Sequence, residues 1–102
     1  MFQFRYNEED SRLKNREVFY LYCDDKLYYS QPLLIPVKLE INRNKRSILL
    51  NNILITSDIK MCKDIFEFII AIKEILDIDN YTVDNSVNSG DFYRELYKKE
   101  II

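Results

Sequence analysis

The chain has 102 residues and a formal net charge of −2 at pH 7, and it contains no histidine, no tryptophan and a single glycine. A length of this order suits one domain spanning residues 1–102. The missing residue types exclude nucleophilic catalysis with a histidine base, a structural zinc site within one chain, and a glycine-rich phosphate loop.

The compartment is indicated by the ends of the chain and by its cysteines. The N-terminus lacks the layout of a signal peptide, and no apolar run is long enough to span a membrane. Cys23 and Cys62 both lie in apolar runs, so we expect two buried, chemically unimportant thiols and a reduced, cytoplasmic protein. Enrichment in Phe, Tyr, Ile, Asn and Lys is typical of A/T-rich genes, as in low-GC bacteria and their phages. The protein is therefore expected in a bacterial host cell or an infected cell.

The first quarter of the chain predicts two strands around a polar segment. Residues 2–6 alternate between apolar and polar, which indicates a half-buried strand. Residues 7–16 are polar apart from Leu13 and predict a long exposed loop. Residues 17–23 are rich in aromatic and β-branched side chains on both faces and predict a central strand.

Further strands are predicted up to residue 56. Asp24-Asp25 indicates a turn, with 26–31 returning as a hairpin partner. Residues 33–41 alternate cleanly, but Pro36 lacks an N–H, so this strand is expected at an edge or with a bulge. After a turn at 42–45, residues 47–56 form one strand, or two if Asn51-Asn52 makes a second turn.

The remainder of the chain predicts helices. Apolar residues at helical spacing indicate one long helix over about 58–77, with Ser57 as its N-cap. Residues 81–83 are a candidate short strand, and a short C-terminal helix is expected over about 90–100. Phe92 and Leu96 should anchor that helix on the flank of the long helix that carries Phe68. The predicted fold is α+β: an antiparallel meander of four to six strands over 1–56, with the long helix on one face.

Two acidic patterns are weak matches to metal sites. Asp77, Asp79 and Asp84 resemble the start of a calcium loop, but that loop's glycine and its final glutamate are missing. Asp24-Asp25-Lys26 has the Asp-x-Lys spacing of metal-dependent nucleases, with Asp10 as a second acid. A solvated loop and a hairpin turn explain these residues more simply. We therefore assign no catalytic, metal or cofactor residue.

The surface offers candidates for recognition. Lys38 and the turn 42–46 are basic, and eight tyrosines supply a residue type favoured at interfaces. The polar segment 7–16 adds charges of both signs. The candidate partner-binding residues are Arg12, Tyr28, Tyr29, Arg43, Lys45 and Arg46.

The sequence therefore predicts a protein-binding module that is not an enzyme. The expected partner is another protein, such as a host nuclease, a toxin or a nucleoprotein complex, and the chain would act as an inhibitor or modulator of the anti-defence or toxin-immunity type. Nucleic-acid binding through the basic turn 38–46 is the first alternative, and a small metal-dependent nuclease is the second. No membrane contact is expected, and a monomer and a homodimer both stay open.

Overall fold

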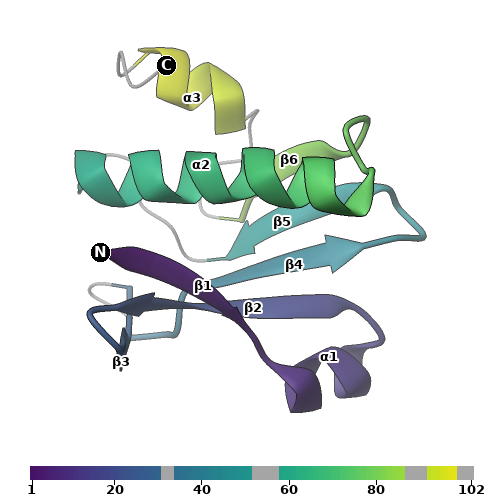
Figure 1. Cartoon of the computed structure of the whole chain (residues 1–102), viewed down its shortest axis with the longest axis horizontal. Helices are drawn as coiled ribbons and strands as arrows, with labels where there is room; N and C mark the ends of the chain where they lie inside the picture. The colour runs from purple at the N-terminus through teal and green to yellow at the C-terminus, as the bar shows by residue number, and fades with distance from the viewer. Residues whose placement is uncertain (31–33, 52–57, 87–91, 99–102) are drawn as a thin grey trace.

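The computed structural model describes residues 1–30, 34–51, 58–86 and 92–98, and it shows an α+β fold (Figure 1). A sheet of six strands carries a long helix on one face. The elements in chain order are β1 (Phe2–Tyr6), α1 (Glu8–Lys14), β2 (Glu17–Cys23), β3 (Lys26–Leu27), β4 (Lys38–Asn42), β5 (Ser47–Asn51), α2 (Ile59–Leu76), β6 (Thr82–Asn85) and α3 (Phe92–Lys98).

The predicted fold class is confirmed. The strands lie in the order β1-β2-β4-β5-β6, and β3 pairs with β2. All neighbours are antiparallel except β5 and β6, which are parallel because α2 connects them as a crossover. The short strand expected at 81–83 thus exists as β6, and it makes the sheet mixed.

The sheet has one apolar and one polar face. Strand register places Phe4, Leu21, Leu39, Leu50 and Ile48 on the same face, and each is at most 9% exposed. The buried side of α2 completes this core with Met61, Cys62, Ile65 and Ile69. The opposite face carries mainly polar side chains, because strand residues alternate between faces.

The N-cap of α2 lies one residue later than predicted. The N-cap is Asp58, whose side chain accepts a hydrogen bond from the Met61 backbone N–H at 3.1 Å. Ser57 lies outside the described residues. The helix ends at Leu76, and its C-cap Asp77 takes the left-handed conformation with φ of 56°.

The prediction of a long loop over 7–16 is wrong, because the segment contains α1. Asn7 caps this helix by accepting a hydrogen bond from the Asp10 N–H. Acidic residues follow in the first turn and basic residues in the last, as the helix dipole favours. The residue that the helix buries is Ser11, which exchanges hydrogen bonds with the Val18 backbone. The helix therefore needs no apolar stripe, and the sequence shows none.

The predictions for the middle strands need two corrections, and one question stays open. β4 lies inside the sheet between β2 and β5, and not at an edge. This is possible because Pro36 precedes the strand, where it forms an isolated bridge with Tyr29. β3 is limited to Lys26–Leu27. β5 ends at Asn51, and the question of a second strand up to 56 falls outside the described residues.

α3 has one of its two predicted anchors among the described side chains. Leu96 is fully buried within the core, as expected of an anchor, whereas the Phe92 side chain lies outside the description. The helix contacts β6. The Phe68 flank of α2 is filled by the rings of Phe4 and Phe19.

Candidate binding site at the α1 end of the sheet

Strand register defines two ends of the sheet. The α1 end is where β1 finishes, β2 begins and β4 turns into β5, because Tyr6 pairs with Phe19 and Glu17 pairs with Ile41. The β3 end is where β2 turns into β3 at Asp24-Asp25. Two positive φ angles, 50° and 68°, make this turn, and Asp tolerates them.

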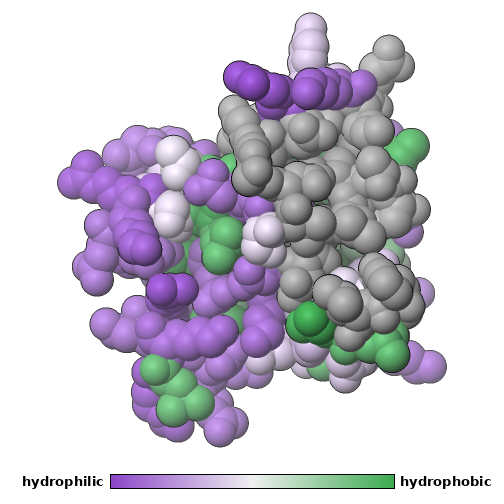
Figure 2. All heavy atoms as spheres, turned by 180° about the vertical axis from the view of Figure 1, so that it is seen from behind, coloured by the Kyte–Doolittle hydropathy of each residue, from purple (hydrophilic) through white to green (hydrophobic). Residues whose placement is uncertain are grey.

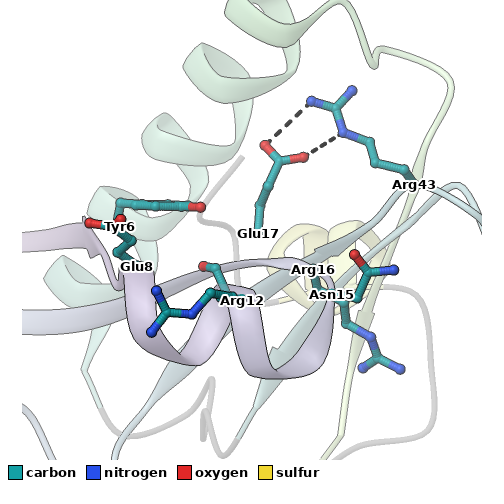
Figure 3. Close-up of a pocket in the computed structure, with 8 residues that line it drawn as sticks. Tyr6, Glu8, Arg12, Asn15, Arg16, Glu17 and Arg43 are labelled. Atoms are coloured by element: carbon teal, nitrogen blue, oxygen red, sulfur yellow. Dashed lines mark hydrogen bonds and ion pairs between the residues drawn. The ribbon is translucent and has the colours of Figure 1, made fainter.

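A pocket of about 380 Å³ opens at the α1 end. Its lining combines α1, the start of β2 and the turn after β4. The lining residues are Tyr6, Glu8, Ser11, Arg12, Asn15, Arg16, Glu17 and Arg43. In Figure 3, Arg12 lies on the same side as Tyr6 and Glu8, whereas Arg16 points away from the pair formed by Glu17 and Arg43.

Glu17 and Arg43 close one wall of this pocket with a two-pronged ion pair. Arg43 Nε donates to Glu17 Oε1 at 2.5 Å, and Nη2 donates to Oε2 at 3.3 Å. The hydrogen bond to Glu17 is the main cause that raises the pKa of Arg43, and Tyr81 contributes. Such paired, planar bonds fix the orientation of the guanidinium.

Behind the pocket, Asp10 ties α1 to the polar face of the sheet. Its Oδ2 accepts hydrogen bonds from the Tyr20 hydroxyl at 2.9 Å and from Lys38 Nζ at 3.4 Å. Burial alone would raise the pKa of Asp10, but the bond from Tyr20 and the charge of Lys38 outweigh it and lower this pKa. Lys38 also lies over the Tyr20 ring at 4.9 Å. Lys38, a member of the predicted basic turn, is therefore already engaged within the protein.

Glu40 makes a second connection between α1 and the sheet. Its side chain is only 5% exposed, with Lys14 Nζ at 3.5 Å and Arg16 Nη1 at 3.6 Å from Oε1. Asn51 Nδ2 donates a hydrogen bond to Oε2. A buried carboxylate is costly unless it is compensated, so the two cations next to it hold α1 and its C-terminal turn against β4.

Three cations at this end remain available to a partner. Within the described part of the chain, Arg12, Lys45 and Arg46 form no ion pair, and all three are exposed. Seen from behind, the side of the molecule that carries α1 and the 42–46 turn is mostly hydrophilic (Figure 2). Arg46 has a φ of 52°, and its carbonyl accepts a hydrogen bond from Thr82 N. This bond joins the turn to β6.

The structure separates the predicted recognition residues into two groups. Arg12 and Arg43 line the pocket together, and Lys45 and Arg46 lie in the same turn as Arg43. Tyr28 and Tyr29 lie at the β3 end. The Tyr28 ring packs edge-on against Phe2 with centroids 5.5 Å apart, and Tyr29, which is 45% exposed, bridges to Pro36.

Sequence reasoning missed Tyr6 and Glu17 as parts of this site, whereas Arg16 belongs to the polar segment 7–16 that it included. The only signal of Tyr6 and Glu17 was position, since they stand at the end of one strand and at the start of the next. That signal acquires meaning only with the register that brings β1, β2 and β4 together.

Asp24 and Asp25, the acids of the Asp-x-Lys motif, engage in ordinary surface contacts. Asp24 pairs with the N-terminal ammonium at 2.8 Å, and Asp25 pairs with Arg5. Asp10 lies on α1, before the start of β2, whereas the Asp24-Asp25 turn follows the end of β2. The acids of the nuclease pattern therefore lie at opposite ends of this strand. Over residues 1–30, 34–51, 58–86 and 92–98, no cluster of three or more Cys, Asp or Glu could hold a metal ion.

Comparisons with protein-family models, curated proteins and solved structures found no match to this chain. Among the described helices, none is long and apolar enough to cross a membrane. Function is therefore inferred from the residues and their arrangement.

Proposed function

We propose that this protein is a binding module, not an enzyme, which acts inside a cell by attaching the α1 end of its sheet to another protein and modulating it. The observation that carries the proposal is the pocket that Arg12, Arg16 and Arg43 line from α1, the following turn and the β4–β5 turn. Arginine and tyrosine are favoured at protein interfaces, and Tyr6 on the rim of this pocket is 55% exposed.

The rigidity of the site supports this proposal. The buried Glu40 and the half-buried Asp10 anchor α1, and Glu17 orients Arg43. A partner then pays little to order these side chains, which raises affinity for a given contact area. Inhibitor and immunity-type proteins need this kind of preformed surface, and we place the chain in that functional class.

The test is capture of a partner from host lysate, followed by affinity measurements with single alanine variants. Arg12→Ala and Arg46→Ala should each weaken binding, and Arg43→Ala should weaken it about thirtyfold if Arg43 is a hot spot. Lys26→Ala is the matched control, because Lys26 is an exposed cation at the β3 end. Equal binding by all four variants, each of them folded, would contradict the proposed site.

Nucleic-acid binding is the second candidate, favoured by the exposed Lys45 and Arg46 in the 42–46 turn. The two candidates differ in salt dependence. Phosphate contacts make the logarithm of the affinity fall with the logarithm of salt by about 0.9 for each neutralised phosphate of duplex DNA. A shallow slope together with loss of binding in Tyr6→Ala supports a protein partner. A steep slope that Tyr6→Ala leaves unchanged supports nucleic acid.

A further inference from the structure

β1 is an edge strand whose outer backbone groups can be identified. The carbonyl of Met1 accepts a hydrogen bond from Asp24 N, and Asn7 N donates to the Val18 carbonyl, so odd-numbered residues of this segment face β2. The backbone N–H and C=O groups of successive residues in a strand point to opposite sides. Those of Phe2, Phe4 and Tyr6 therefore face outward, away from β2. Figure 1 shows β1 along the margin of the sheet beneath α2.

The protein satisfies the first of these outer groups by itself. Phe2 N donates to Asp64 Oδ2 of α2 at 3.1 Å. α2 contacts β1, but no described strand pairs with the outer side of β1, and neither Phe4 N nor Tyr6 N donates a hydrogen bond within the described part of the chain. A row of N–H and C=O groups of this kind is a template for an added strand.

α2 and α1 each carry an exposed side chain toward the end of the molecule where β1 finishes. Phe68 of α2 packs against Phe4, and Ile75 lies on the same side of α2, about two turns further toward the α1 end. Ile75 is 74% exposed. Tyr6 ends β1 on the rim of the arginine pocket, where Arg12 forms no ion pair with any described residue.

We propose that the β1 edge receives an extended segment of the partner protein as a seventh strand, with an acidic side chain of that segment placed at Arg12. The backbone groups of Phe4 and Tyr6 supply affinity that does not depend on sequence, and Arg12 and Ile75 select an acidic segment with an apolar neighbour. This inference rests on the proposed function, since it names the chemistry of the partner at the same end of the molecule.

Amide hydrogen exchange tests the edge directly. In the free protein, Gln3 and Arg5 should be protected by their bonds to β2, whereas Phe4 and Tyr6 should exchange at least tenfold faster. The probe is a synthetic peptide of alternating valine and threonine that ends in two glutamates. This peptide should slow exchange at Phe4 and Tyr6, and the same peptide ending in two glutamines should bind more weakly.

A variant pair isolates the contribution of the backbone. Tyr6→Pro removes an outward N–H that the sheet does not use, and Tyr6→Ala removes the side chain but keeps that N–H. Peptide binding should be about three- to tenfold weaker in Tyr6→Pro than in Tyr6→Ala. Equal stability of the two variants in urea would show that the fold is retained. If Tyr6→Pro unfolds, the exchange rates of the parent protein decide alone.

Four outcomes would overturn the inference: no binding of the glutamate peptide, binding without protection of Phe4 and Tyr6, equal binding of the glutamine peptide, or protection that rises with protein concentration alone. The last would assign the edge to a second copy of this chain. Failure of this inference can be told from failure of the proposed function. A natural partner that responds to Arg12→Ala and binds Tyr6→Pro as tightly as Tyr6→Ala would keep the site and refute the added strand.

Discussion

At the scale of single residues, the contacts of Asp10 predict how the stability of the fold depends on pH in acid. Its side chain is 19% exposed and holds Tyr20 and Lys38, and its pKa is lowered in the folded protein. A lowered pKa contributes stability that is present above the unfolded value of about 3.9 and is lost as pH falls through the folded value. Asp10→Asn should therefore lower the free energy of unfolding by about 1–2 kcal/mol at pH 7.

Urea unfolding at pH 7 and pH 3 provides the measurement, with Glu9→Gln as the control. Glu9 is the exposed neighbour of Asp10 on the same helix turn. The parent and Glu9→Gln should lose stability steeply between these pH values, and Asp10→Asn should lose less. If Asp10→Asn loses as much unfolding free energy between pH 7 and pH 3 as the parent, the role of Asp10 is contradicted.

The two thiols should react at different rates, although the sequence predicted burial for both. Cys62 is fully buried, and burial is the main cause that raises its pKa to about 11, so almost no thiolate forms near neutral pH. Cys23 is half-buried at the end of β2, next to Asp24. A thiol reagent should therefore label Cys23 at least tenfold faster, as followed by mass spectrometry, and denaturant should remove the difference. Faster labelling of Cys62 in the native protein would be the contrary result.

At the scale of elements, the C-terminal helix should contribute to stability through one side chain. Leu96 is fully buried with the core, whereas its neighbour Tyr97 is 73% exposed. Leu96→Ala should cost about 2–4 kcal/mol through lost burial and a residual cavity, and Tyr97→Ala should change stability by less than about 0.5 kcal/mol. Chemical denaturation of both variants decides the matter. A tolerated Leu96→Ala would mean that α3 is not part of the cooperative fold.

Elements with strong periodicity were predictable from the sequence, and elements held by single polar contacts were not. β1, β2 and α2 follow from alternation or helical spacing because each buries a continuous apolar side. α1 buries only Ser11, so the sequence indicates this helix only through its N-cap Asn7 and the order of its charged residues. The position of β6 depends on where α2 returns the chain, and no local pattern encodes that.

The candidate site shows the same division. Arg12 and Arg43 are recognisable as exposed arginines, but thirty residues of chain separate them. Only the register of β2 against β4 brings α1 to the β4–β5 turn, and that register is set by apolar residues on the other face. The same register places Tyr28 and Tyr29 at the far end of β2. No property of these two residues in the sequence predicts that position.

At the scale of the whole molecule, we expect a monomer at micromolar concentration. The most exposed apolar side chains of the described residues lie on separate parts of the fold: Met1 before β1, Leu13 on α1, Leu34 before β4, Ile75 near the end of α2 and Tyr97 on α3. Scattered apolar residues do not form the contiguous patch that a stable homodimer buries. Sedimentation velocity from about 5 to 100 µM should give one concentration-independent species of the mass of a single chain, 12.4 kDa. A shift toward twice this mass would contradict the expectation and direct attention to β1, the open edge along which two copies could pair. In that event Tyr6→Pro, which removes an outward N–H, should restore the monomer, whereas Tyr97→Ala on α3 should leave the dimer intact.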